Sequence, residues 1–195
     1  TPEDTIEKNF KSVQILAKEV ASDLTVLYGA EIYYSTELMD KLEKKMIPSI
    51  NGSSYVLIEF SRNITFWEIK SGLINILRLG YIPVVAHVER YQAFDRNEEY
   101  LKEIINMGCY IQINSSSVLK AKWFNDKNKV LKKRAKYFLD RDLVHCIASD
   151  MHHISERPSF MKEAFNFISK KYGRKKAKKL FVDNPKLIIT NQIIE

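Results

Sequence analysis

Five polar side chains, most of them able to bind a metal, each follow an apolar, strand-like run of the sequence. They are Glu31, Glu59, His87, Asn114 and Asp150. The intervals between them are 28, 28, 27 and 36 residues, which suits repeated strand–helix units. In βα barrels the active site is built at the carboxyl ends of the strands. We therefore expect these side chains to gather at one end of a parallel sheet.

Metal binding is the chemistry that these residue types favour. The donors are carboxylates and imidazoles without a thiolate, a set that suits Mn²⁺, Fe or Zn²⁺ better than a soft metal. Asp150 and His152 are two residues apart at a strand end, so their side chains can point the same way. The candidate metal ligands are Glu31, Glu59, His87, Asp150 and His152.

Two arginines lie next to these candidate ligands in the sequence. Arg90 comes three residues after His87, and Arg157 comes five residues after His152. A planar guanidinium next to a metal cluster suits the oxygens of a phosphate group. Arg90 and Arg157 are therefore the candidate phosphate-binding residues.

The sequence contains none of the motifs tested for a mechanism with a protein nucleophile. A cysteine phosphatase needs an arginine six residues after its cysteine, but Ser115 follows Cys109 at that distance and His152 follows Cys146. Neither a P-loop pattern nor a GxSxG elbow is present. The mechanism that remains is hydrolysis by a water molecule activated by a bound metal.

The elements that must position these residues alternate along the chain. Strands are predicted at 24–28, 55–58, 82–86, 109–113 and 144–148, and helices at 6–20, 66–79, 98–107, 128–139 and from 158 onward. Alternating strands and helices predict a parallel α/β sheet with right-handed crossovers. A closed barrel needs about seven or eight strands. Two or three further units are therefore expected before Thr1, and an open doubly wound sheet is the alternative.

Composition and charge exclude several classes of protein. The 195 residues, 45% hydrophobic and 28% charged, predict one domain over residues 1–195. We expect no membrane insertion and no secretory leader, and two cysteines favour the cytoplasm. The net charge of +7 comes from residues 170–179, which hold seven basic residues and no acid. That segment is typical of a solvated helix face, or of a surface for an acidic partner, and we expect no nucleic-acid partner.

Segments spread along the chain, such as YGAEI at 28–32, PVVAHVERY at 83–91 and IASDMH at 147–152, resemble those of the polymerase-and-histidinol-phosphatase (PHP) superfamily. Within it, the chain is similar to the bacterial manganese-dependent protein-tyrosine phosphatases of capsule and exopolysaccharide operons. The matching segments run over nearly the whole chain and are YGAEI at 28–32, YVLIEF at 55–60, PVVAHVERY at 83–91, QIN at 112–114, IASDMH at 147–152, Arg157-Pro158 and Asn184-Pro185.

This resemblance implies a distorted (β/α) barrel of PHP type, here without its N-terminal strand–helix units. The family's DxHxH motif on the first strand is absent, and the chain begins about where the family's third helix does. The resemblance implies two or three metals, with Mn²⁺ expected and Fe or Zn²⁺ possible. Glu31 would bridge them, with Glu59 and His87 on one side and Asp150 and His152 on the other. Arg90 and Arg157 would bind the phosphate.

The function implied is hydrolysis of phosphotyrosine on a bacterial tyrosine autokinase, which would regulate capsular or exopolysaccharide synthesis. One alternative is a PHP phosphoesterase acting on a small ester such as histidinol phosphate. Another is an inactive, truncated remnant that only binds the kinase. Unpaired strand edges would also favour a homo-oligomer.

Overall fold

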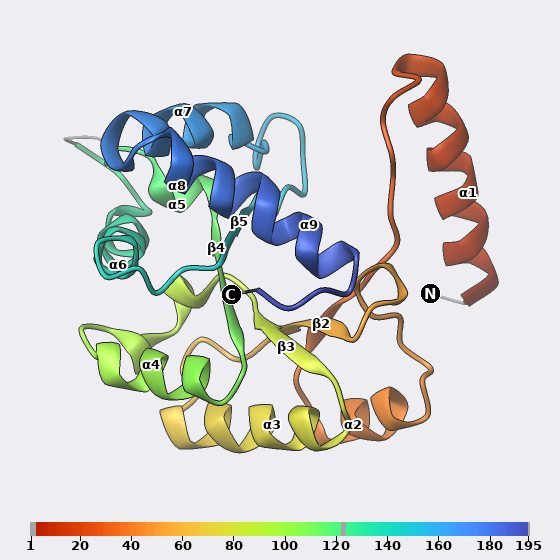
Figure 1. Cartoon of the computed structure of the whole chain (residues 1–195), viewed down its shortest axis with the longest axis horizontal. Helices are drawn as coiled ribbons and strands as arrows, with labels where there is room; N and C mark the ends of the chain where they lie inside the picture. Colours follow the sequence, from red (N-terminus) through yellow and green to blue (C-terminus); the bar gives the residue numbers. More distant parts are fainter. Residues whose placement is uncertain (1–2, 122–123, 195) are drawn as a thin grey trace.

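Five short parallel strands form one sheet whose spatial order follows the chain, β1-β2-β3-β4-β5 (Figure 1). The structure is a computed structural model that describes residues 3–121 and 124–194. Its strands are β1 (Glu31–Tyr33), β2 (Tyr55–Glu59), β3 (Ile82–Val85), β4 (Tyr110–Asn114) and β5 (Cys146–Ala148). A doubly wound sheet reverses its strand order at a switch point, and this sheet does not. The doubly wound alternative is therefore wrong, and the order is that of a (β/α) barrel.

Helices connect and cover the strands. They are α1 (Glu3–Val20), α2 (Thr36–Glu43), α3 (Phe66–Arg78), α4 (Glu98–Asn106), α5 (Ser115–Val118), α6 (Lys129–Leu139), α7 (Met161–Tyr172), α8 (Arg174–Lys178) and α9 (Asn184–Ile189). Short 3-10 turns cover Ile50–Gly52, Val88–Arg90 and Gln92–Phe94, and a π-helical turn covers Lys179–Asp183. None of the described helices is both long and apolar enough to cross a membrane.

Local sequence signals explain where the crossover helices begin and end. Thr65 and Glu68 form a reciprocal capping box at the start of α3, as their spacing predicts. Gly80 and Gly108 follow α3 and α4 with φ angles of 83° and 96°. Only glycine adopts this region at little cost, so both glycines turn the chain into the next strand.

The two faces of the sheet bury different side chains. Val56 and Ile58 of β2 belong to the larger core, which also holds the buried faces of α3, α4, α6 and α7. Tyr55 and Leu57 point the other way, toward a smaller cluster with Ile188 of α9. This alternation is the two-residue period of a strand buried on both faces.

The C-terminal segment covers the amino ends of the strands. Tyr55 Oη donates to the Gln192 carbonyl at 2.7 Å, and Tyr110 Oη donates to the Ile194 carbonyl at 3.2 Å. Both tyrosines begin strands, β2 and β4. The polar residues that follow the strands lie at the opposite end of the sheet, the carboxyl end.

The first predicted strand, 24–28, is wrong. This stretch is an unpaired connection between α1 and β1, and the strand starts at Glu31. Leu24, Leu27 and Tyr28 are 51%, 40% and 37% exposed, so their apolar side chains do not pack as a buried strand would. In this part of the chain, β2 pairs with residues 31–33 only, so the run 24–28 is not a strand of the sheet. Glu31 is therefore the first residue of its strand and does not follow a strand end.

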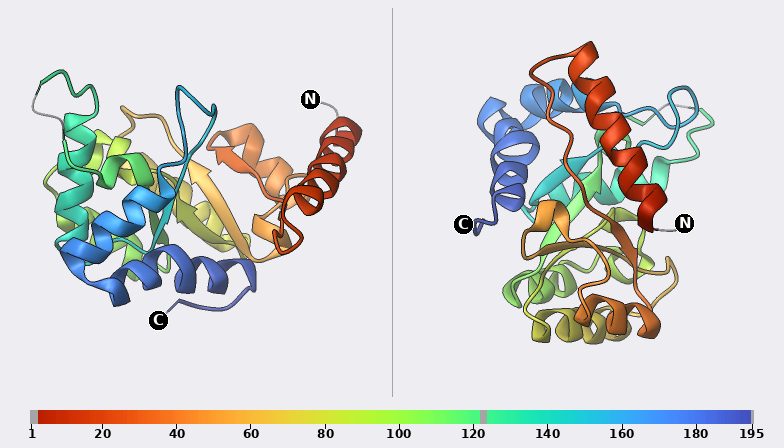
Figure 2. Two further views of the ribbon diagram at one scale, coloured as in Figure 1. Left: turned by 90° about the horizontal axis from the view of Figure 1, so that it is seen from above. Right: turned by 90° about the vertical axis from the view of Figure 1, so that its right-hand side faces the viewer.

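Helix α1 lies at the edge of the molecule (Figures 1 and 2). Phe10 contacts the ring of Tyr28 with centroids 5.1 Å apart, and Gln14 donates to the Val26 carbonyl. Val13 and Val20 of its predicted apolar face are 49% and 86% exposed. The predicted helix is confirmed, but much of its apolar face is not buried by the described residues.

Part of the basic segment 170–179 is used inside the fold. Lys176 binds Asp142 at 2.6 Å and the Leu139 carbonyl, and Lys178 binds Asp183 at 2.9 Å. These contacts fasten α8 to the end of α6 and to the π-helical turn.

His145 gives the fold an expected pH dependence. It precedes β5, at the end of the sheet away from the candidate ligands, and its Nδ1 accepts the Ile111 N–H at 3.1 Å. Burial, and to a smaller extent Lys179, lowers the pKa of His145 from 6.5 to about 4. Between these two pKa values, the unfolded chain therefore binds a proton on His145 that the folded chain does not bind. The free energy of unfolding should fall by up to about 3 kcal/mol between about pH 7 and pH 4.

Urea unfolding of the protein and of His145→Gln at several pH values checks this expectation. The variant should show a flatter pH dependence, whereas exposed His153→Gln should keep that of the parent protein. Parallel profiles for the parent and His145→Gln would assign the acid sensitivity to other groups.

Candidate metal centre and phosphate pocket

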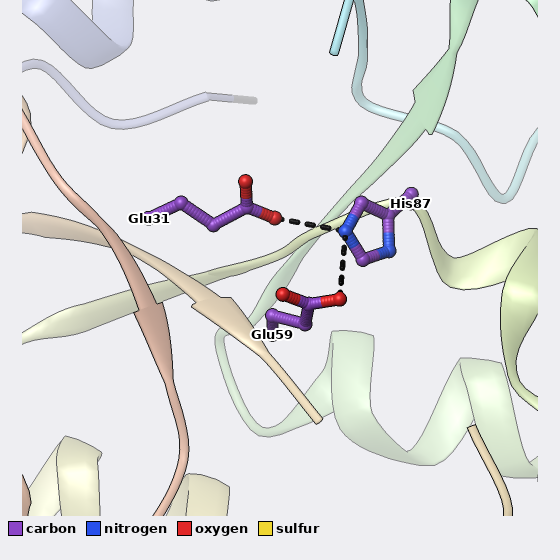
Figure 3. Close-up of side chains that lie close together, drawn as sticks. All are labelled: Glu31, Glu59 and His87. Atoms are coloured by element: carbon purple, nitrogen blue, oxygen red, sulfur yellow. Dashed lines mark hydrogen bonds and ion pairs between the residues drawn. The ribbon is translucent and has the colours of Figure 1, made fainter. Parts of the chain in front are cut away.

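The side chains of Glu31 in β1, Glu59 in β2 and His87, which follows β3, lie close together (Figure 3). His87 Nε2 lies 2.8 Å from Glu31 Oε1 and 3.4 Å from Glu59 Oε1. One potential ligand atom from each residue lies within 4.8 Å of the other two. The imidazole is buried, whereas the two carboxylates are about one-third exposed at 33% and 31%. A cation could therefore reach the carboxylates from solvent.

Strand pairing and an unusual backbone conformation place these three side chains. Glu59 ends β2 and is in register with Tyr33, two residues after Glu31. His87 follows β3 in the left-handed region, with φ 31° and ψ 53°. Its N–H donates to Gln112 Oε1 at 2.5 Å, which holds a conformation that is uncommon for a non-glycine residue.

The donor set fits a divalent cation. Two carboxylates and one imidazole are ligands that suit Mn²⁺, Fe or Zn²⁺. Within residues 3–121 and 124–194, this is the one group of three or more such side chains whose ligand atoms come so close together. Carboxylates placed near each other repel, and a cation between them would offset that repulsion.

Asp150 and His152 do not join this group. Asp150 Oδ2 accepts from Asn114 Nδ2 at 2.7 Å, from Arg157 at 2.6 Å and from Arg90. His152 is 60% exposed, with its Nδ1 3.4 Å from Asp150 Oδ1. The structure thus arranges the five candidate ligands as two groups, Glu31/Glu59/His87 and Asp150/His152. Their common role in metal binding stays a prediction.

A buried chain of hydrogen bonds connects the two groups through β4. The His87 N–H donates to Gln112, Gln112 Nε2 donates to Asn114 Oδ1 at 3.0 Å, and Asn114 donates to Asp150. Because the amide of Gln112 accepts from His87, its nitrogen must face Asn114. Asn114 in turn presents its own nitrogen to Asp150, so the chain of bonds fixes Asp150 as an acceptor.

Gln112 and Glu89 were not among the sequence candidates. Gln112 could have been found, because it shares one side of the apolar strand β4 with Asn114. Glu89, between His87 and Arg90, is fully buried and its Oε1 accepts the Asn114 N–H at 3.1 Å. Burial raises the pKa of Glu89 above its ordinary value, chiefly through loss of hydration. Glu89 therefore fixes the end of β4 that carries Asn114.

A pocket of about 380 Å³ opens beside Asp150. Its lining includes three arginines, Arg62, Arg90 and Arg157, two carboxylates, Asp150 and Glu156, and the apolar side chains of Leu131, Pro158 and Phe160. The sequence reasoning missed Arg62, although Arg62 comes three residues after Glu59, the same interval as that from His87 to Arg90. The volume is near the lower end of the roughly 300–1,000 Å³ typical of small-molecule pockets. Its arginines make the pocket suitable for an anion.

Neither cysteine is placed for nucleophilic catalysis. Cys109 and Cys146 are buried in the core, and burial raises the pKa of each thiol to about 12. The thiolate is the reactive form, so both side chains are inert packing groups. This agrees with the absence of a cysteine-phosphatase motif.

Comparisons with known proteins give a consistent result. The family model described as capsular polysaccharide synthesis, CpsB/CapC, matches residues 1–190. The chain is 57% identical over 194 residues to the tyrosine-protein phosphatase CpsB of Streptococcus pneumoniae. It is 49% identical over 194 residues to the protein of the same name from Streptococcus agalactiae. Each alignment covers 100% of this chain and 80% of the relative.

The fold comparison agrees with the sequence comparison. The chain superposes with a TM-score of 0.83 and 29% identity on a crystal structure from work on YwqE of Bacillus subtilis and CpsB of Streptococcus pneumoniae. Those two proteins are described as metal-dependent tyrosine phosphatases. The superposition covers 96% of this chain and 74% of the other.

Proposed function

The chain belongs to the CpsB/CapC family of capsular polysaccharide synthesis, and we propose that it is a metal-dependent tyrosine-protein phosphatase. The observation that carries this proposal is the Glu31/Glu59/His87 group together with an arginine-lined pocket beside Asp150. The substrate would be phosphotyrosine on a protein, with a bacterial tyrosine autokinase as the expected partner. The reaction would take place in the cytoplasm within a single domain, residues 1–195.

Mn²⁺ is the cation that we propose for this site. Glu31, Glu59 and His87 would hold it, with Asp150 and His152 contributing from the neighbouring strand end. When bound, the metal would supply positive charge for the phosphoryl group and activate a water molecule for attack. Glu31 Oε1 lies 2.8 Å from His87 Nε2, so one cation could contact both side chains.

The arginines would bind the phosphate group. Arg157 is 45% exposed on its side chain and Arg90 is 16% exposed, and both contact Asp150 Oδ2. Each guanidinium has five N–H donors, so it can bind a phosphate oxygen while keeping its contact with Asp150. The equatorial oxygens carry the charge that develops in phosphoryl transfer. The tyrosinate that leaves has an ordinary pKa near 10, so it needs less protonation than an alkoxide.

The test is hydrolysis of a phosphotyrosine peptide by the complete gene product that carries this chain, with and without Mn²⁺. We expect Mn²⁺-dependent release of phosphate and much slower hydrolysis of histidinol phosphate. Addition of a chelator should stop the reaction, and Mn²⁺ should restore it. Preference for histidinol phosphate, or no release of phosphate from either substrate, would refute the proposed activity.

A further inference from the structure

Phe160 occupies a backbone position that disfavours phenylalanine. It precedes α7 with φ 48° and ψ 17°, in the left-handed region. A bulky residue rarely adopts this conformation, which is easiest for glycine and asparagine. The N-cap position also favours short polar side chains, and Phe160 makes no side-chain cap bond. Stability alone would favour asparagine here.

Packing in the core does not explain this phenylalanine. Phe165 and Phe167 of α7 pack against the larger core, and Phe165 also contacts Phe181. Phe160 belongs to neither core cluster, and no aromatic partner of its ring occurs among the described residues. Its partly exposed ring instead lines the pocket that contains Arg90 and Arg157.

The strained segment is held next to the candidate site. Ser115, the residue after β4, donates its hydroxyl to the Ser159 carbonyl. The Phe160 carbonyl accepts the Ala164 N–H at 2.9 Å, as the first turn of α7 requires. Backbone strain that is maintained in this way is commonly found at ligand-binding sites.

We infer that Phe160 is a specificity-determining residue that binds the aromatic ring of phosphotyrosine. This inference rests on the proposed function. Phe160, Pro158 and Leu131 form the apolar part of the pocket lining, and the arginines form its cationic part. A phosphotyrosine side chain has the same two parts, an apolar ring and an anionic phosphate. Phosphoserine has no ring, so it could use only the arginines.

The effect of Phe160 should be confined to binding. Contact with the ring is the same in the ground state and the transition state, so its loss raises KM and leaves kcat almost unchanged. Asparagine at position 160 removes the ring and suits the left-handed backbone. Phe160→Asn should therefore raise KM for a phosphotyrosine peptide about tenfold while Tm rises by roughly 2–4 °C.

Three comparisons separate this effect from a structural one. Phe160→Tyr keeps the ring and should keep the KM of the parent protein. Lys45→Asn relieves another left-handed residue, with φ 55°, outside this pocket, so it should raise Tm without changing KM. Hydrolysis of a matched phosphoserine peptide should be unaffected by Phe160→Asn. An unchanged KM for phosphotyrosine, or an equal rise for both peptides, would overturn the inference.

A binding measurement keeps the inference testable apart from catalysis. In calorimetric titrations, phenylphosphonate should bind the Mn²⁺-loaded protein more tightly than methylphosphonate, and Phe160→Asn should remove most of the difference. Equal binding of the two phosphonates would contradict a role for Phe160 in ring recognition. A protein that shows the difference in binding but no hydrolysis of phosphotyrosine would instead refute the proposed function.

Discussion

Replacing Glu59 by glutamine is expected to remove tight Mn²⁺ binding and to slow phosphotyrosine hydrolysis on the order of a thousandfold. Glu59 supplies one of the two carboxylates in the group whose ligand atoms lie within 4.8 Å of one another. A neutral amide of the same shape is a much poorer ligand. Loss of a residue that only supports a ligand already costs about 10- to 100-fold, so loss of the ligand itself should cost more.

The same substitution should affect stability with opposite signs in the presence and absence of metal. Without metal, Glu59→Gln removes the repulsion between Glu59 and Glu31, so the free energy of unfolding should rise by about 0.5–1 kcal/mol. With Mn²⁺, the parent protein should gain stability through binding to the folded state, and the variant should gain little.

Thermal unfolding of the complete gene product with and without Mn²⁺ checks both expected changes in stability, and metal analysis checks the expected loss of Mn²⁺. Glu99→Gln is a suitable control, because Glu99 is 75% exposed on α4 and pairs with Lys102. This control should behave like the parent protein in both measurements. Equal Mn²⁺ content in the parent and in Glu59→Gln would exclude Glu59 as a ligand.

Most of the fold could be predicted because its signals are local. The runs 55–58, 82–86, 109–113 and 144–148 are apolar, and each contains most of a strand of the sheet. Capping residues and glycines marked α3 and α4. The run 24–28 looked equally apolar, but whether such a run forms a strand depends on a neighbour with which to pair. That information lies in the position of β2 and not in the run itself.

The candidate site was predictable in part for the same reason. Strand ends place Glu59, His87 and Asp150 at one edge of the sheet, as the repeated spacing predicted. The division into two groups could not be predicted, because it arises from charge pairing between Asp150 and two arginines that were assigned to phosphate. Gln112 could have been found on the same side of β4 as Asn114, but Glu89 acts through a hydrogen bond from the backbone of β4, for which a single sequence gives little signal.

Replacing Arg157 by alanine should reduce kcat/KM for phosphotyrosine about a hundredfold, or on the order of 3 kcal/mol, because one charge-assisted contact in the transition state is lost. Metal content should stay nearly unchanged. Arg157 reaches Asp150 from a half-exposed position, and Arg90 and Asn114 keep their bonds to the same carboxylate when Arg157 is removed. Asp150 therefore retains its placement in the variant.

Arg157→Lys separates charge from geometry. Lysine keeps the positive charge but loses the planar fork that binds two oxygens, so its activity should lie between those of alanine and arginine. Arg141→Ala is the matched control, since Arg141 pairs with Glu98 and lies over the Tyr137 ring, 3.6 Å from its centroid. Arg141→Ala should retain full activity and metal content. A parallel loss of metal and activity in Arg157→Ala would show that Arg157 maintains the structure of the Asp150 loop and does not bind the phosphate.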